Sequence, residues 1–235
     1  PGPYERISLV AHYIKNNKPN SKIIVLDQKD KFSKQALFSN GWKELYGDLI
    51  EWRAAQFGGK VVSVDPVKKI VVTEDEEVQA DVLNYIPNQK ASQLAFDSGL
   101  VADGKDWCDI HPKTFESKLV KNVHVIGDAS NAAPMPKSAF SASTQGKVVA
   151  LQIARMLKQQ EPLNPPKLAN TCYSLLSPNY GISIAAVYNA LDDKIQNVDG
   201  AGGVSPETDP DGHIRILEAK YAYAWYESQT ADIFK

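Results

Sequence analysis

The sequence has few of the residues and patterns that mark several large protein classes. Only two of its 235 residues are cysteine, Cys108 and Cys172. Two cysteines are too few for a disulfide-rich scaffold, and they could form one bridge or remain two buried thiols. No apolar run approaches the roughly 18 residues that cross a bilayer, so we expect no membrane span.

The charge balance and the histidines exclude further classes. The chain has 26 Lys and Arg against 28 Asp and Glu, a net charge of −2, so we expect no nucleic-acid partner. Its four histidines lack metal-ligand spacing, and we predict no metal site. No Cys-x-x-Cys-His motif attaches haem to this chain. The start, Pro1-Gly2-Pro3, has neither the charged nor the apolar region of a signal peptide.

Hydrophobic periodicity in the first 87 residues predicts alternating helices and strands. Residues 4–17 and 34–46 read as helices, with a buried parallel strand at 23–26 between them. Residues 60–64 and 69–73 read as an antiparallel hairpin, and 78–86 as a further strand. This order is typical of part of a βαβ layer, so the fold class is α/β.

The rest of the chain divides at a proline-rich stretch that contains Pro162, Pro165 and Pro166. Before it we expect a short helix at 92–98, an apolar strand at 123–126 and a long helix at 138–157. After it we expect a hairpin of 180–188 with 194–198, a loop at 201–203, and an aromatic-rich helix at 213–234.

The segment VHVIGDASNAAPMPKSAFSASTQGK, residues 123–147, has the strongest local signal for chemistry. A strand ends at Gly127 and Asp128, and ligands in open α/β sheets gather at that edge. The next helix begins near Lys137 and Ser138, so its positive dipole end faces the same region. By itself the pattern is weak, because an aspartate that only caps a turn gives it too.

Asp27 also ends an apolar strand, where an acidic residue often holds the ribose of a pyridine nucleotide. No Gly-x-Gly-x-x-Gly loop precedes it to cradle a pyrophosphate. We therefore interpret Asp27 as a turn residue and predict no pyridine-nucleotide binding.

Residues 123–147 resemble the second FAD-binding stretch of the glutathione-reductase-like flavoproteins. Five further segments resemble the flavoprotein of flavocytochrome c sulfide dehydrogenase: PGPYER (1–6), APMPKSAFSAS (133–143), LANTCYSLLSPNYGISIAAVY (168–188), GAGGVSP (200–206) and EAKYAYAWYESQTADIF (218–234). The resemblance implies the C-terminal part of that protein, with an incomplete two-dinucleotide-binding-domain fold and a C-terminal α+β interface domain.

The resemblance also implies three domains. Residues 1–87 would form the second dinucleotide-like domain, 88–160 the C-terminal part of the FAD-binding domain, and 161–235 the domain that docks a cytochrome. FAD would be the cofactor, with Gly127 and Asp128 as FAD contacts. Lys137, Ser138 and Ala139 would contact the flavin edge.

Cys172 stands in the Asn-Thr-Cys-Tyr-Ser motif and carries the catalytic role that the resemblance implies. In the family this cysteine forms a redox-active disulfide with a cysteine that lies just upstream of Pro-Gly-Pro-Tyr-Glu-Arg, outside this sequence. Sulfide attacks the disulfide and two electrons pass to the flavin. Cys108 matches neither cysteine of the pair, and we interpret it as a structural thiol. Trp225 could lie near the flavin, although hydrophobic packing explains it better.

The implied activity is sulfide oxidation with electron transfer from the flavin to a c-type cytochrome in the periplasm. Without the Gly-x-Gly-x-x-Gly loop, we expect the chain alone to bind FAD weakly or not at all, to be inactive, and to self-associate through a bare FAD face. Two alternatives stay open. One is a sulfide:quinone reductase-like or disulfide reductase-like flavoenzyme, and the other is a non-catalytic structural or interaction module.

Overall fold

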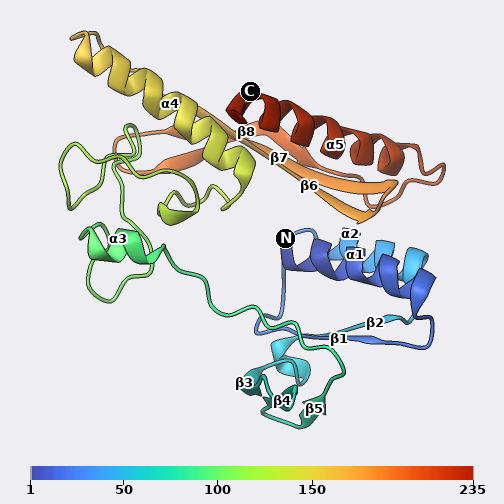
Figure 1. The fold of residues 1–235 in the computed structure, drawn as a ribbon. Helices are drawn as coiled ribbons and strands as arrows, with labels where there is room; N and C mark the ends of the chain where they lie inside the picture. Colours follow the sequence, from blue (N-terminus) through green and yellow to red (C-terminus); the bar gives the residue numbers. More distant parts are fainter. Residues whose placement is uncertain (1, 235) are drawn as a thin grey trace. The chain divides into compact units, whose positions relative to one another are not determined.

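A computed structural model describes residues 2–234, which form a mixed α/β protein, as the sequence predicts (Figure 1). The chain divides into two compact units. The first contains the residues up to Ile86, Tyr173–Ser183 and those from Val204 on, and the second contains Pro87–Cys172 and Ile184–Gly203. The predicted three-domain boundaries remain a prediction.

The first unit begins with the predicted helix–strand–helix order. Its elements are α1 (Gly2–Asn17), β1 (Ile23–Leu26), α2 (Gln35–Tyr46) and β2 (Ile50–Arg53). Strands β1 and β2 pair in parallel with Ile23 opposite Ile50, which confirms the parallel arrangement. Both faces were predicted to be buried, but Ile24 is 39% exposed.

Asp27 directly follows β1 and is buried, which the sequence analysis did not predict. Its carboxylate accepts hydrogen bonds from the Tyr4 hydroxyl at 2.6 Å and the Trp52 indole N–H at 3.1 Å. It also accepts from the Lys29 backbone N–H at 3.1 Å, and this bond closes the turn that the sequence predicted. Burial acts to raise the pKa of Asp27, but these hydrogen bonds outweigh it and lower that pKa. Asp27 therefore anchors an aromatic core as well as a turn.

The aromatic side chains around Asp27 belong to the core of the first unit. The ring of Phe32 stacks on Tyr4 with centroids 3.6 Å apart, and Trp52 meets Phe32 edge-on at 5.3 Å. Ser8 is fully buried and accepts from the Trp42 indole N–H at 2.7 Å. This bond lies on the buried face of α1, to which Ser8 belongs, whereas Val10 is 42% exposed.

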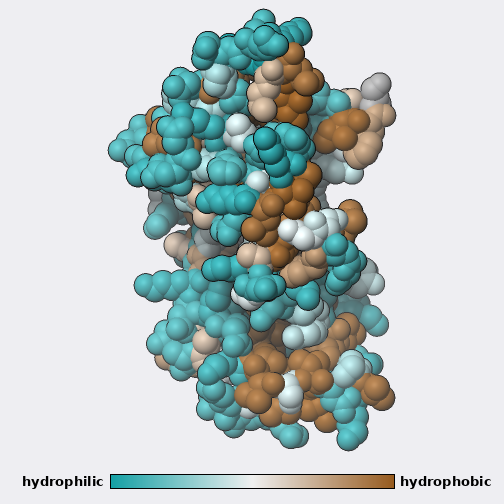
Figure 2. All heavy atoms as spheres, turned by 90° about the vertical axis from the view of Figure 1, so that its left-hand side faces the viewer, coloured by the Kyte–Doolittle hydropathy of each residue, from teal (hydrophilic) through white to brown (hydrophobic). Residues whose placement is uncertain are grey.

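A three-stranded antiparallel sheet follows in the first unit, after the short 3-10 helix η1 (Ala55–Phe57). Strands β3 (Val61–Asp65) and β4 (Ile70–Thr73) form the predicted hairpin. The third strand was predicted at 78–86, but β5 (Glu77–Gln79) is shorter and pairs with β4 over its three residues. Apolar surface gathers low in the view of Figure 2, at the height of β3–β5 in Figure 1.

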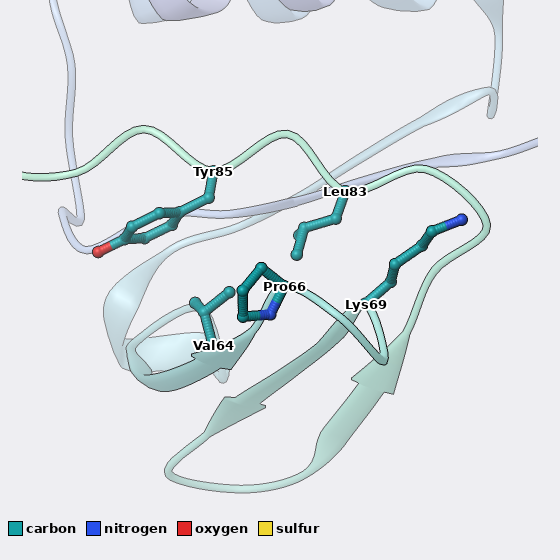
Figure 3. Close-up of a pocket in the computed structure, with 5 residues that line it drawn as sticks. All are labelled: Val64, Pro66, Lys69, Leu83 and Tyr85. Carbon is teal, nitrogen blue, oxygen red and sulfur yellow. The ribbon is translucent and has the colours of Figure 1, made fainter.

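The segment after β5 turns back along the hairpin and encloses a small open pocket of about 350 Å³ (Figure 3). Its lining residues are Val64, Pro66, Lys69, Leu83 and Tyr85. The Lys69 ammonium points away from the apolar side chains and donates to the Asp81 carbonyl at 2.8 Å. The pocket is therefore an apolar notch without a polar group directed into it.

The second unit contains α3 (Gln93–Asp97), the 3-10 turn η2 (Gly127–Ala129) and α4 (Ala139–Leu157). Both α-helices were predicted. The predicted strand at 123–126 was wrong: His124 forms only an isolated antiparallel bridge with Glu116, and the Val125 N–H donates to the Phe115 carbonyl. The segment bonds to the turn just before it instead of entering a parallel sheet.

Strands β6 (Lys167–Ser177), β7 (Tyr180–Ala190) and β8 (Ile195–Val204) form a sheet in that order, and α5 (His213–Phe234) follows. The predicted hairpin and final helix are confirmed, whereas β6 was missed. The predicted loop at 201–203 was wrong, because these residues extend β8. Among the described residues no helix has the length and apolar character that a membrane crossing requires. Trp225 of α5 packs against Tyr173, with ring centroids 6.5 Å apart.

Candidate functional site

The turn at Gly127 is fixed by hydrogen bonds from both sides. Gly127 has φ of 67°, a conformation that favours glycine. Its N–H donates to the side-chain carbonyl of Gln145 at 2.7 Å, and its carbonyl accepts from the Ser130 hydroxyl at 2.8 Å. A Cβ at this position would lie 3.3 Å from that of Ala142 on α4. The turn and the first part of α4 therefore form one closely packed unit.

Lys137 holds the same turn from its other side. Its ammonium donates to the carbonyls of Asp128 at 2.6 Å and Ser130 at 2.8 Å, and it lies 3.7 Å from the ring centroid of Trp107. Burial lowers the pKa of Lys137, and the charge of Asp128 partly opposes this effect. The Asp128 carboxylate itself belongs to an exposed residue. Lys137 thus positions the turn, while Asp128 is open to a ligand.

Helix α4 starts where the sequence predicts. Ser138 is its N-cap and accepts from the Ser141 N–H at 3.1 Å. Ala139 is exposed, and apart from Phe140 the residues from there to Ser143 are alanine or serine. The positive end of the dipole of this 19-residue helix therefore meets an open surface.

Cys172 lies on the buried face of β6, where every second side chain from Leu168 to Leu176 is buried. Its sulfur is 3.4 Å from the side-chain nitrogen and 3.5 Å from the side-chain oxygen of Asn170. That oxygen also accepts hydrogen bonds from Ser138 at 2.6 Å and Ser141 at 3.1 Å. The structure therefore joins two of the predicted site residues, Cys172 and Ser138, through Asn170.

Cys108 lies in the core of the second unit and is fully buried. Its backbone bonds to the residues that follow Gly127: its N–H donates to the Ala129 carbonyl, and its carbonyl accepts from the Asn131 backbone N–H. Burial raises the pKa of its thiol, and nearby Lys137 acts in the opposite direction. Cys108 and Cys172 are both buried and are not joined in a disulfide. Cys108 has the environment of a structural residue.

Two supporting residues were not singled out in the sequence. Gln145 is 2% exposed and Asn170 is 3% exposed. Gln145 lies within the segment 123–147 and Asn170 begins the Asn-Thr-Cys-Tyr-Ser motif, but neither residue was assigned a role. Within residues 2–234, no three His, Cys, Asp or Glu side chains are grouped as metal ligands.

Two sequence models of one family match the chain. The central model of the sulfide dehydrogenase (flavocytochrome c) flavoprotein chain matches residues 1–87, and the flavin-binding model of flavocytochrome c sulphide dehydrogenase matches residues 164–234. The chain belongs to the flavocytochrome c sulfide dehydrogenase flavoprotein family. This family binds flavin, and its cofactor is FAD.

A solved structure shares the fold of this family member. A chain in the cryo-EM structure of the Tetrahymena thermophila mitochondrial ATP synthase aligns with a TM-score of 0.57 and 15% identity. The alignment covers 92% of this chain and 51% of that chain, so the family member spans about half the length of the structure that it matches. At this identity the likeness concerns the fold alone.

The site residues fit one polar edge of a flavin. At the Gly127 turn, Ala142 lies close to where a Cβ would be, so the turn has no room for a larger side chain. The exposed Asp128 carboxylate is a hydrogen-bond acceptor, and the N-terminus of α4 supplies the positive end of the helix dipole. The Gly127 N–H and the Lys137 ammonium already bond within the chain. Direct flavin contacts by Gly127, Asp128, Lys137, Ser138 and Ala139 remain predictions.

Proposed function

We propose that this chain is part of an enzyme that oxidises sulfide with FAD and passes the electrons to a c-type cytochrome. The observation that carries the proposal is the hydrogen-bond network of Cys172, Asn170 and Ser138. It connects a buried sulfur to the N-terminus of α4, where the family resemblance puts the flavin edge. Thiol–flavin chemistry requires such a sulfur next to an electron acceptor.

FAD, when bound, accepts two electrons and develops negative charge on its pyrimidine edge. The N-terminus of α4 would stabilise that charge through its dipole and its first backbone N–H groups. The Asp128 carboxylate would accept hydrogen bonds from sugar or ribityl hydroxyls. Lys137 would keep the 128–130 turn in place through its two carbonyl contacts.

Cys172 would form a disulfide with a second cysteine that is outside this sequence. The sulfur of sulfide forms a bond to one of the two cysteines while the bond between them breaks, and the other leaves as a thiolate. Transfer of two electrons from the resulting persulfide and thiolate to a bound flavin would let the added sulfur atom leave at the zero-valent level and would restore the disulfide. A disulfide-based site suits the periplasm, the compartment that we propose.

We propose that residues 1–87, 88–160 and 161–235 act as the central, FAD-binding and cytochrome-docking regions. Because no Gly-x-Gly-x-x-Gly loop is present to hold the pyrophosphate, this chain alone should bind FAD weakly and not turn over sulfide. Exposed apolar surface at the flavin face should favour self-association, which light scattering after gel filtration would measure.

The test is a visible absorbance spectrum of the purified chain before and after addition of FAD, followed by sulfide with cytochrome c or a quinone as acceptor. A tightly bound stoichiometric flavin in the chain alone would contradict the weak-binding proposal. In protein reconstituted with the remaining FAD-binding region, reduction of cytochrome c supports the proposed activity. Reduction of quinone alone by the reconstituted protein supports the sulfide:quinone reductase-like alternative. A reconstituted protein without a flavin band supports the structural module.

A further inference from the structure

We infer that Trp107 is the positioning residue for the Lys137 ammonium and, through it, for the turn that carries Asp128. The inference rests on the proposed function in one respect, that FAD binds at this turn. No motif of the sequence assigns a role to Trp107. The geometry that assigns one belongs entirely to the second unit.

The Lys137 ammonium has three contacts. It donates to the Asp128 carbonyl at 2.6 Å and to the Ser130 carbonyl at 2.8 Å, and it lies over the Trp107 ring, 3.7 Å from the ring centroid. A cation within about 6 Å of the face of a tryptophan is attracted by the ring quadrupole. An ammonium group has three N–H donors and no acceptor, so two carbonyls and one ring face account for all of it.

The two carbonyl bonds alone would hold Lys137 only weakly. Lys137 is an exposed residue, so water competes for its donors, and its long side chain loses rotamer freedom when the ammonium is fixed. The Trp107 ring covers the ammonium on one side. Burial lowers the pKa of Lys137, which agrees with an ammonium that water reaches only in part. Trp107 therefore supplies the contact that keeps an otherwise exposed lysine on the turn.

The backbone on both sides of Trp107 is fixed, which gives its ring a defined place. The Asp106 carbonyl accepts from the Ala91 N–H at 2.8 Å, and the Cys108 N–H donates to the Ala129 carbonyl at 2.9 Å. The ring also packs against the core cluster of the second unit that contains Cys108. The turn is therefore bonded to the residue that follows Trp107 as well as to the lysine under its ring.

The consequence is a fixed place for the Asp128 side chain. The backbone carbonyl of Asp128 is bonded to Lys137, while the residue itself is exposed. An acceptor that is already in position loses less conformational freedom when a ligand binds than a mobile one does. We therefore expect Trp107 to contribute to FAD affinity without contacting FAD.

The test is a double-mutant cycle in the chain itself, read from hydrogen exchange of the Ser130 amide by NMR. This N–H donates to the Gly127 carbonyl at 3.1 Å and closes the turn. Trp107→Leu should accelerate its exchange about fivefold, the size expected for a cation–π contact at a partly exposed site. In the Lys137→Met background the same change should have little further effect, because the cation is gone. Trp107→Phe keeps a weaker ring face and should give an intermediate rate.

A purely structural role gives a different result. If the ring only fills space, Trp107→Leu accelerates Ser130 exchange by the same factor in the parent and in the Lys137→Met background, and equal factors overturn the inference. So does unchanged exchange in Trp107→Leu. Phe96→Leu is the matched control, because Phe96 packs against the same core and its ring lies 5.1 Å from the Lys90 ammonium. It should leave Ser130 exchange unaltered, and an acceleration equal to that of Trp107→Leu also overturns the inference.

A second measurement does not require Trp107→Leu to fold. Protons above an aromatic face resonate at higher field, so the ε-methylene protons of Lys137 in the parent should lie upfield of those of Lys158, an exposed lysine. Trp107→Phe should reduce this difference. Equal shifts for the two lysines in the parent would overturn the inference.

The proposed function fails on a different measurement. In protein reconstituted with the remaining FAD-binding region, Trp107→Leu should weaken FAD binding about fivefold. Unchanged FAD affinity, with the cycle as expected, would overturn the proposed FAD contact at Asp128 and leave the role of Trp107 toward Lys137 intact. The exchange and chemical-shift results do not depend on bound FAD, so the two failures are distinguishable.

Discussion

The side-chain carbonyl of Gln145 accepts the backbone N–H of Gly127 at 2.7 Å. This bond ties the turn that carries the predicted FAD contacts to the second turn of α4. It also occupies the Gly127 N–H, so a ligand at this turn meets the Asp128 side chain and the helix end instead. The turn is consequently positioned from within the chain before any cofactor arrives.

Replacement of Gln145 by Ala should destabilise this turn. The Gly127 N–H would lose its acceptor inside the protein, which costs roughly 1–3 kcal/mol. Urea unfolding should show this loss, and amide hydrogen exchange at Gly127 should accelerate. Gln79→Ala, at an exposed position of β5, is the control and should change stability by less than about 0.5 kcal/mol. Unaltered exchange at Gly127 in Gln145→Ala would show that the bond does not hold the turn.

Tyr4→Phe should destabilise the first unit. The Tyr4 hydroxyl donates to the buried Asp27 carboxylate at 2.6 Å, and loss of a hydrogen bond to a charged group costs roughly 1.5–3 kcal/mol. The stacking of this ring on Phe32 stays intact in the variant. Tyr13→Phe, on the exposed side of α1, removes a hydroxyl without this partner and should be nearly neutral. Equal unfolding midpoints for the two variants would contradict the anchoring role of Asp27.

The stability contributed by Asp27 should depend on acid pH. Since folding lowers the pKa of Asp27, this carboxylate stabilises the protein above its unfolded pKa of about 3.9 and loses that effect as the pH falls through the lower folded value. The difference in unfolding free energy between the parent and Asp27→Asn should therefore be largest near neutral pH and shrink below pH about 4. A difference that grows towards acid pH would mean that folding raises this pKa.

Two glycines of the C-terminal sheet should respond in opposite ways to alanine. A Cβ at Gly181 would lie 2.4 Å from the backbone nitrogen of Ala219 on α5, so strand and helix would have to separate. Overpacking of this kind costs at least about 2 kcal/mol. A Cβ at Gly203 meets nothing within 4 Å, and Gly203→Ala should be neutral or slightly stabilising. Thermal unfolding measures the stability of both variants. A similar loss of stability in Gly181→Ala and Gly203→Ala would contradict the close packing of β7 on α5.

The long helices were predictable from the sequence, α1 and α4 from an apolar period that runs through many residues and α5 from its aromatic-rich composition. Helices α1, α4 and α5 lie within a few residues of their predicted bounds, and α5 matches at both ends. The apolar segment 123–126 was predicted as a strand on its composition, but a strand also requires a neighbour with free backbone groups. In this structure its backbone bonds instead to residues 115–117. The composition of residues 123–126 does not indicate which backbone groups this segment will bond to.

The candidate site was predictable only where a residue type has its own chemistry. Gly127, Asp128, Ser138 and Cys172 stand out by type and motif, and the structure brings Ser138 and Cys172 into one network. Gln145 and Asn170 lie within the quoted segments, but their roles were not predicted, because a buried amide acquires its role from partners that are distant in sequence. Ser138 and Asn170 are 32 residues apart and meet only when α4 packs on β6.

The proposed function requires Cys172 to be the sulfur that reacts with sulfide beside the flavin. The most direct test is an anaerobic sulfide titration of protein that has been reconstituted with the remaining FAD-binding region and loaded with FAD, with the visible flavin absorbance followed in the parent, Cys172→Ser and Cys108→Ser. We expect bleaching of the flavin band in the parent and in Cys108→Ser, and no bleaching in Cys172→Ser. Bleaching of Cys172→Ser at the parent's rate would contradict this requirement.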